Sequence, residues 1–187
     1  MTQTRLDIAV LNGSLRSASI GARLATALAG LAPEGPAFSP VPIGELALYN
    51  QDLEQDPPAP WRAFRERIAA ADALLFVTSE SNRSIPSPLK NAIDVGSRPW
   101  GKSVWSGKPA LVVSHSQGLL GGFGANHHLR QALSCLNVAA LPAPEVYLSN
   151  STQLLDDAGA FANSETRDFL AGVMAAFDDW IRRTAGR

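Results

Sequence analysis

The sequence predicts a single α/β domain with an open parallel sheet of five strands and helices on both faces. Short apolar runs alternate with helical patterns along the whole chain, which is typical of parallel sheets with right-handed crossovers. The segments 71–78 and 108–116 contain uninterrupted apolar stretches, as expected of strands covered on both faces. With 187 residues, 45% of them hydrophobic, residues 1–187 are enough for one well-packed domain.

The first half of the chain supplies two strands and two helices. A strand at 7–12, "DIAVLN", ends at a Gly-Ser turn, and an Ala- and Leu-rich helix follows at 21–32. A weaker strand is expected at 37–43, where the prolines indicate an edge of the sheet. A Pro-rich segment then precedes a helix at about 61–71.

The second half repeats this alternation. The strand at 71–78 leads into a short helix at 87–97, whose Pro88 suits a first helical turn. After the strand at 108–116, a glycine-rich turn precedes a helix at 125–137. The fifth strand is expected within "VAALPAPEVYL", and a last helix at 164–183. That helix carries apolar residues four apart, which predict its buried stripe: Phe169, Val173, Phe177 and Ile181.

The composition of the chain limits which binding partners and which cellular compartment are expected. Sixteen basic and 17 acidic residues give a net charge of −1, so we expect no nucleic-acid partner. No run approaches the roughly 18 apolar residues of a membrane span, so we expect no membrane insertion. The single cysteine, Cys135, excludes an intrachain disulfide and fits a reducing compartment, which predicts a cytoplasmic protein. Its apolar neighbours predict a buried core thiol.

The loop after the first strand has the residues of a phosphate site. In "NGSLRSASIGARLA", Gly13 permits a tight turn, Ser14 and Ser19 offer hydroxyl groups, and Arg16 supplies a cation. The helix that follows presents free backbone N–H groups, beginning near Ile20, and the positive end of its dipole. Together these groups favour phosphate binding, although an ordinary serine-capped helix is the alternative. The loop matches neither the Walker nor the dinucleotide fingerprint.

Two further loops that follow predicted strands have an unusual residue composition. Ser79 to Ser84 form a polar rim that can hydrogen-bond the edge of a flat heterocycle, with a solvated loop as the alternative. The segment "SHSQGLLGGFG" holds four glycines within seven residues, which lets backbone approach a ligand or simply makes a turn. Because parallel strands end at one edge of a sheet, all three loops are expected to lie together.

These three loops resemble the NAD(P)H-dependent FMN reductase family, including its quinone and chromate reductase members. Segment 13–21, "GSLRSASIG", is similar to the family pattern Gly-Ser-x-Arg-x-x-Ser-x-Asn. The segments "SESN", "SIP" and "LKNAID" within 79–94 resemble a Pro-Glu-Tyr-Asn loop, a Ser-x-Pro turn and Leu-Lys-Asn-Ala-Ile-Asp. "GKP", "SQGLLGG", "HLRQ" and "PE" between 107 and 145 match a third family pattern. The match covers about residues 5–147.

The resemblance implies a flavodoxin-like sheet of order 2-1-3-4-5, bound FMN, and a homodimer or homotetramer with sites close to subunit interfaces. Ser14, Arg16, Ser19 and Ile20 would hold the phosphate. Five residues would border the flavin ring on one side: Ser79, Glu80, Ser81, Asn82 and Arg83. Four would lie at its other edge: Ser116, Gly118, Gly121 and Gly122.

The chain departs from the family pattern at three positions. Gly21 replaces the family's Asn in the phosphate loop, which removes a side-chain donor. Ser79 and Ser81 replace the Pro and Tyr of Pro-Glu-Tyr-Asn, and the family's Tyr lies by the ring. Trp100 or Trp105 can substitute for that aromatic contact, or can pack locally or at an interface.

The function predicted is ping-pong reduction by bound FMN. NADPH or NADH delivers hydride to flavin N5, and a quinone, an azo compound, a metal oxyanion or free flavin then takes the electrons. The flavin carries the chemistry, so no catalytic side chain is required. The alternative is a non-enzymatic flavin- or nucleotide-binding protein, such as an electron carrier or a regulatory subunit.

Two other sites are disfavoured by the sequence. Ser87 and Lys90 fit the Ser-x-x-Lys pattern of acyl enzymes, but the companion Ser-Asp-Asn and Lys-Thr-Gly motifs are missing. His127 and His128 are adjacent and point in different directions on a helix, so we predict no metal site.

Overall fold

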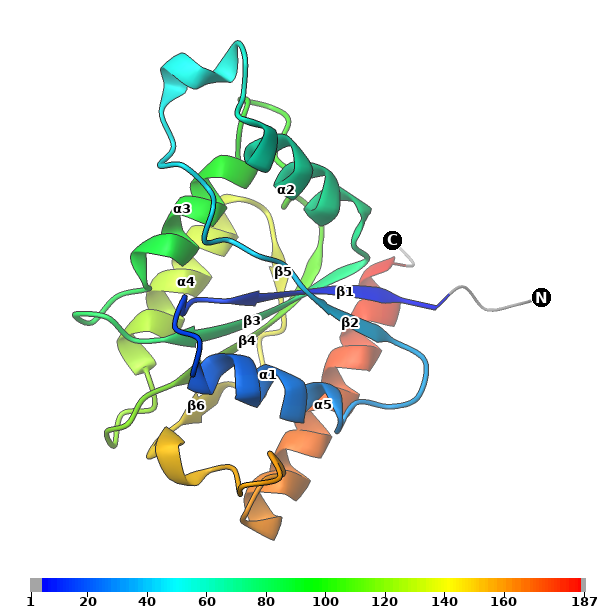
Figure 1. Cartoon of the computed structure of the whole chain (residues 1–187). Coiled ribbons are helices and arrows are strands. Elements are labelled where there is room, and N and C mark those ends of the chain that lie inside the picture. The colour runs from blue at the N-terminus through cyan, green and yellow to red at the C-terminus, as the bar shows by residue number, and fades with distance from the viewer. Residues whose placement is uncertain (1–4, 186–187) are drawn as a thin grey trace.

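A computed structural model describes residues 5–185 and has one parallel sheet as its middle layer (Figure 1). The strand order is β2-β1-β3-β4-β5, and β6 also pairs with β4. The strands are β1 Asp7–Asn12, β2 Ala37–Pro40, β3 Ala73–Ser79, β4 Pro109–His115, β5 Ala139–Ala140 and β6 Val146–Leu148. The predicted open parallel sheet and its order are therefore confirmed, with a sixth strand added.

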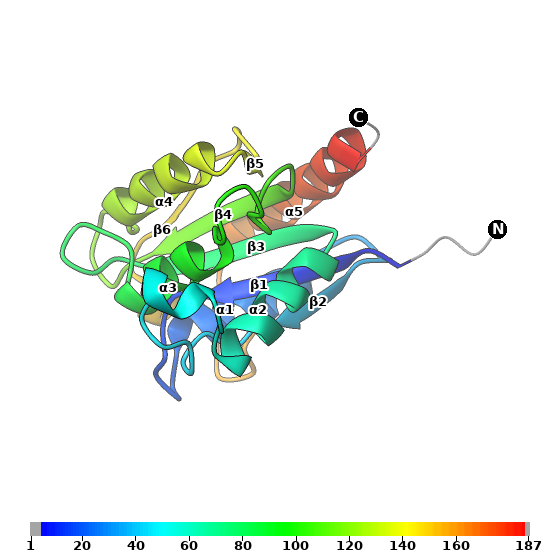
Figure 2. The same cartoon turned by 90° about the horizontal axis from the view of Figure 1, so that it is seen from above.

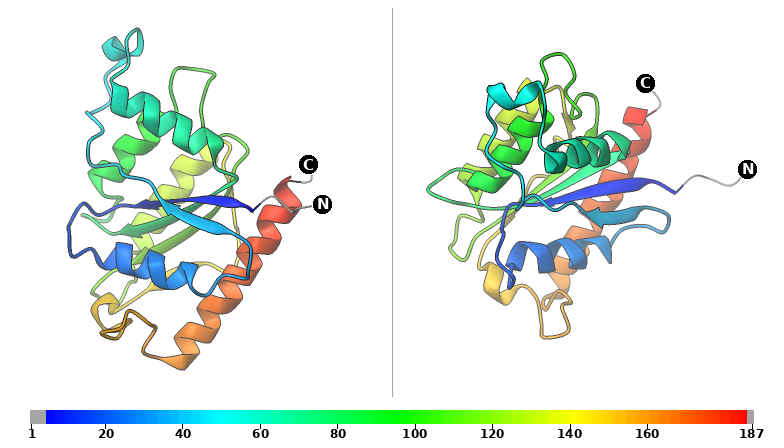
Figure 3. Two further views of the ribbon diagram at one scale, coloured as in Figure 1. Left: turned by 45° about the vertical axis from the view of Figure 1, so that its right-hand side comes forward. Right: turned by 45° about the horizontal axis from the view of Figure 1, so that its top comes forward.

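Helices cover both faces of the sheet (Figures 1 and 2). The helices are α1 Ile20–Ala29, α2 Ala59–Ala70, α3 Ser87–Gly96, α4 Phe123–Cys135 and α5 Ser164–Ala185, with short 3₁₀ turns at Gln51–Glu54 and Ser151–Gln153. Helices α1 and α5 pack side by side on one face (Figure 3), and α2, α3 and α4 lie on the other. No helix within residues 5–185 is long and apolar enough to span a membrane.

The alternation of side chains along the strands produces two apolar cores. In β3, Leu74 and Phe76 belong to the core under α2, α3 and α4, whereas Leu75 and Val77 belong to the core under α1 and α5. All four side chains are fully buried. The continuous apolar run at this strand therefore reflects burial on both faces, as the sequence predicted.

The predicted fifth strand is divided into two short pieces. Both β5 and β6 pair with β4, and Pro142 and Pro144 lie between them. Proline has no backbone N–H to donate to a ladder, so a continuous strand cannot form through this segment.

Two predictions about buried side chains are wrong. Phe169 is 48% exposed, although Val173 and Phe177 are buried as predicted. Residues four apart on a helix advance by about 400°, so the stripe drifts, and Leu170 takes the buried place. Cys135 is exposed, because Leu133 faces the sheet and a residue two positions further lies on the opposite side of the helix.

Gly96 at the end of α3 tests the packing of the larger core. A Cβ atom there would lie 2.6 Å from the ring of Trp105, which is fully buried and donates to the carbonyl of Ile93 at 2.9 Å. Gly96→Ala is expected to lower the free energy of unfolding by roughly 1–3 kcal/mol, measured by urea denaturation.

Gly172 on α5 is the matched control, because a Cβ atom there meets no atom within 4 Å. Gly172→Ala should raise the free energy of unfolding by roughly 0.5–1 kcal/mol through helix propensity alone. Equal effects of the two substitutions would contradict the packing argument.

Candidate functional site

The carboxyl ends of β1, β3 and β4 meet at one edge of the sheet, on the left in Figure 1. A cavity of about 320 Å³ opens there, between the loops that follow these strands. It is lined by Ser14, Arg16, Ala18, Ser19, Ile20, Gly21, Ser79, Glu80, His115, Ser116, Gln117 and Ser151. Ligands of open α/β sheets bind at this kind of edge, so the cavity is the candidate site.

The side chain of Asn12, the last residue of β1, holds the first loop in place. Its Nδ2 donates to the Ser14 carbonyl at 2.9 Å and to Ser19 Oγ at 3.0 Å. Its Oδ1 accepts from the Ser14 amide at 3.3 Å. The amide group therefore fixes both ends of the turn between the strand and the helix.

The N-terminus of α1 opens into the cavity with its positive end unopposed. Ser19 is the N-cap, and its Oγ accepts from the Ala22 amide at 3.1 Å. The amides of Ile20 and Gly21 have no acceptor within the helix, and its first turn holds no acidic residue. Arg16 is exposed and forms no ion pair with any residue in the described range 5–185. These groups together favour an anion.

The polar rim after β3 folds into a tight hairpin. Ser81 and Ser84 exchange two backbone hydrogen bonds of 2.9 Å, and Asn82 and Arg83 both have positive φ. This geometry is that of a two-residue hairpin turn. Ser81, Asn82 and Arg83 are exposed and lie outside the wall of the cavity.

Glu80 connects this hairpin to α4. Its Oε2 accepts from the Ala125 amide at 3.2 Å, in the first turn of α4, and its Oε1 pairs with Arg83 at 3.1 Å. The Glu80 side chain is only 12% exposed, so the carboxylate serves mainly as a link between the two loops.

The glycines of the third loop allow close packing of protein on protein. Gly121 and Gly122 have positive φ. A Cβ atom at Gly121 would lie 2.6 Å from the carbonyl carbon of Tyr147, and one at Gly122 would lie 3.0 Å from the His115 carbonyl oxygen. Both glycines let the loop turn tightly against β4 and β6. At Gly118 the space around a Cβ atom is open.

His115 and Ser151 form the floor of the cavity, next to Gln117. His115 is the last residue of β4 and is 5% exposed, and its Nδ1 lies 3.3 Å from Ser151 Oγ. Burial lowers the pKa of His115 to about 4, so the imidazole is neutral near pH 7. Ser151 follows β6 and carried no motif, so the sequence offered no signal for it.

Seven of the thirteen predicted site residues line the cavity: Ser14, Arg16, Ser19, Ile20, Ser79, Glu80 and Ser116. The other six lie in the same two loops but outside its wall: Ser81, Asn82, Arg83, Gly118, Gly121 and Gly122. The aromatic substitutes considered from the sequence are also elsewhere. Trp105 is buried in the core against Phe64 and Phe76, and Trp100 is 85% exposed beside Arg98.

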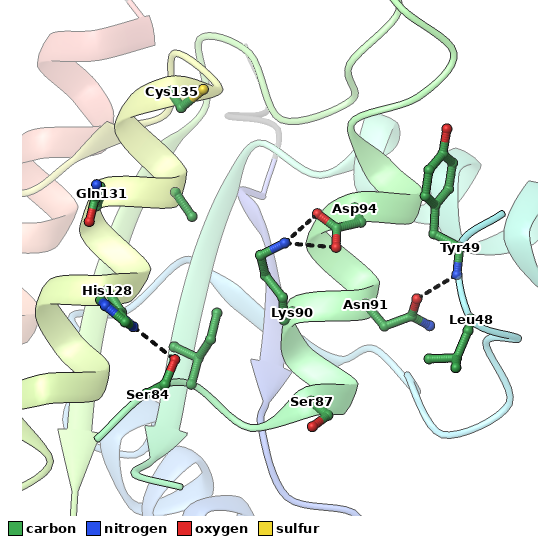
Figure 4. Close-up of a pocket in the computed structure, with 12 residues that line it drawn as sticks. Leu48, Tyr49, Ser84, Ser87, Lys90, Asn91, Asp94, His128, Gln131 and Cys135 are labelled. Atoms are coloured by element: carbon green, nitrogen blue, oxygen red, sulfur yellow. Dashed lines mark hydrogen bonds and ion pairs between the residues drawn. The ribbon is translucent and has the colours of Figure 1, made fainter. Parts of the chain in front are cut away.

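A larger cavity of about 750 Å³ lies between α3 and α4 (Figure 4). Four of its polar side chains are paired with one another. Lys90 pairs with Asp94 at 2.8 Å, and Ser84 Oγ lies 2.8 Å from Nδ1 of His128. Because the smaller cavity opens directly at the carboxyl ends of the strands, where ligands of open α/β sheets bind, we take that cavity as the candidate site.

The fold defines the class of this protein, a flavodoxin-like α/β protein with its candidate site at the carboxyl edge of the sheet. The free amides of α1, the unpaired Arg16 and the serine hydroxyl groups supply the donors that a phosphate requires. The chain belongs to the NADPH-dependent FMN reductase family, whose model matches residues 6–153.

Named relatives agree with this family. A quinone reductase of Pseudomonas putida is 51% identical over 177 residues, covering 94% of this chain and 95% of that protein. A 2-hydroxy-1,4-benzoquinone reductase of a Burkholderia species is 45% identical, covering 95% of this chain and 97% of that protein.

A solved structure is similar along almost the whole chain. The flavoenzyme NAD(P)H:(acceptor) oxidoreductase FerB of Paracoccus denitrificans has a TM-score of 0.91 and is 36% identical, covering 96% of this chain and 98% of that chain. A flavodoxin of Pseudomonas aeruginosa, at a TM-score of 0.56 and 19% identity, covers 92% of this chain and 99% of that chain and shares the fold. The predicted family is confirmed, and with it an oxidoreductase class that uses FMN and NAD(P)H.

The buried His115 predicts a pH dependence of stability. Its pKa is about 4 in the native state against 6.5 in an unfolded chain, so the unfolded chain binds this proton first. The free energy of unfolding should fall as pH decreases from about 6.5 to about 4, by roughly 3 kcal/mol at most, and this contribution is constant below that window.

Urea denaturation of the wild type and His115→Gln between about pH 4 and about pH 7 measures this contribution. Carboxylates titrate in both proteins, so the difference between the two curves isolates the imidazole. Parallel curves would show that His115 does not resist protonation in the native state.

Proposed function

We propose that this protein is an FMN-dependent reductase that transfers electrons from NAD(P)H to quinones. The observation that carries the proposal is the unopposed positive end of α1, which opens with Arg16 into a cavity at the carboxyl edge of the sheet. When bound, FMN accepts a hydride from the nicotinamide and passes electrons to the acceptor. The chain itself binds, orients and shields the reactants.

The two ends of the cavity would bind different parts of the cofactor. The phosphate would be held by Ser14, Arg16, Ser19 and the amides of Ile20 and Gly21. Ser79 and Glu80 on one side and Ser116 on the other would contact the flavin, mainly through their backbone groups, because the Glu80 carboxylate is occupied by Ala125 and Arg83.

Two features support a rigid binding wall. The 81–84 hairpin is closed by two backbone hydrogen bonds, and Glu80 fastens it to α4. The third loop is held by the Ser151 amide, which donates to the Ser116 carbonyl at 2.9 Å, and by the Asn150 amide, which donates to the Gly118 carbonyl at 3.2 Å. A wall that is ordered before binding lowers the entropy cost of holding a cofactor.

Quinones are proposed as the acceptor class because relatives at 51% and 45% identity carry quinone reductase names. We further propose a cytoplasmic protein and a homodimer or homotetramer. The wide groove between α3 and α4 supports self-association, because Ser84 of the hairpin forms part of its wall, so a second copy seated there would lie close to the candidate site.

Flavin binding and turnover test this function directly. We expect the purified protein to bind FMN at micromolar concentration or below, and to oxidise NADH or NADPH when a benzoquinone is added. Absence of FMN binding at tens of micromolar would overturn the proposal. Tight FMN binding without turnover of either nicotinamide would instead favour an electron carrier.

Arg16 provides a test of the phosphate end. Arg16→Ala removes a cation from the anion site, so the Kd for FMN should rise by roughly tenfold, in line with a charge-assisted hydrogen bond. Isothermal titration calorimetry measures the change. Arg62→Ala, on the distant helix α2, is the control and should leave the Kd unchanged. An equal effect of the two substitutions would place the phosphate elsewhere.

A further inference from the structure

His115 has an unexplained polar atom at the floor of the cavity. Its Nε2 is buried and has no hydrogen-bond partner, whereas Nδ1 lies 3.3 Å from Ser151 Oγ. Buried polar atoms are nearly always paired, because an unpaired one loses its hydration without compensation. Because His115 lines the candidate site, its unpaired nitrogen is a candidate partner for a group that binds there.

The two nitrogens of the His115 ring have different surroundings. The imidazole is neutral, since burial lowers the pKa of His115, so one nitrogen donates and the other accepts. The 3.3 Å contact allows two arrangements: either Nδ1–H donates to Ser151 Oγ, or the Ser151 hydroxyl group donates to Nδ1. Only the second arrangement leaves the proton on Nε2. In that tautomer the free atom is an N–H donor, which suits an anion.

The unpaired nitrogen lies directly beneath the start of α1. A Cβ atom built on Gly21 would be 3.1 Å from His115 Nε2 and 2.4 Å from Asn12 Oδ1. Any larger side chain at position 21 would therefore collide with Asn12 and press against the imidazole. The absence of a side chain at Gly21 leaves Nε2 close to the free amides of the first turn of α1.

This arrangement accounts for the missing donor of the phosphate loop. The related sequences were expected to carry an Asn where this chain has Gly21. Here Asn12 fills part of that space from β1, and His115 approaches it from β4. The chain thus replaces a donor on the helix with one on the neighbouring strand.

We propose that His115 Nε2–H donates a hydrogen bond to the phosphate group of the bound flavin mononucleotide. The inference rests on the proposed function and adds a phosphate-binding residue that comes from the sheet. The phosphate would then be contacted from above by the amides of α1 and from below by the imidazole.

Comparing the Kd values of FMN and riboflavin isolates the contribution of the phosphate group to binding. His115→Phe keeps a ring of similar size and removes the donor, so the Kd for FMN should rise by roughly ten- to hundredfold while the Kd for riboflavin stays the same. His115→Gln, which retains an N–H donor, should recover part of the loss. Ser151→Ala should have a smaller effect of the same kind, because it removes only the partner of Nδ1.

A direct measurement on the wild type avoids any loss of folding in the variants. With ¹⁵N-labelled histidine, the Nε2 resonance of His115 should shift when FMN is added and remain in place with riboflavin. An unchanged resonance with bound FMN, or an equal loss of affinity for FMN and riboflavin in His115→Phe, would overturn the inference and leave the proposed function intact. If the wild type binds neither FMN nor riboflavin, both the inference and the proposed function are wrong.

Discussion

The arrangement of the site depends on the parallel direction of the strands in one sheet. All its strands run the same way, so β1, β3 and β4 release their polar loops at a single edge. Both faces of the sheet are covered by helices, and the strands themselves are apolar on both sides. Polar groups are therefore concentrated where the strands end, and α1 begins there with unpaired amides. The proposed anion site therefore depends first on this topology and only then on single side chains.

Side chains then fix the loops against one another. Asn12 binds both ends of the first loop, and Glu80 ties the second loop to the start of α4. Gly121 and Gly122 let the third loop pack against β4 and β6 at distances that no Cβ atom would permit. Most of these polar and small residues serve the shape of the wall, which leaves few groups free to meet a ligand. The free groups are the amides of α1, Arg16 and His115.

The sequence was sufficient for the sheet and for the start of α1, because both depend on local patterns. Burial on both faces is visible in the apolar run of 73–77, and Ser19 is visible as a helix cap. Asn82 and Arg83 lie in a tight hairpin turn, outside the wall of the cavity. The amino-acid composition of the loop does not reveal this backbone geometry. His115 ends β4 and Ser151 begins the 3₁₀ turn after β6, 36 residues further along the chain, so no short sequence motif could join them. The predicted burial of Phe169 was wrong because a spacing of four residues only approximates the helical repeat.

The same physical argument explains why three positions in the phosphate loop must be considered together. Asn12 Oδ1 occupies the place where a Cβ atom at position 21 would lie, so the glycine and the asparagine depend on each other. His115 Nε2, which is unpaired, approaches the same point from β4, at 3.1 Å from where that Cβ atom would lie. Residues that share one small space do not contribute independently to stability or binding. Gly21→Asn alone would therefore introduce a steric clash with Asn12 together with the new donor. On the proposed role of His115, the departure at Gly21 is one part of a rearrangement in which strand residues replace a helix residue.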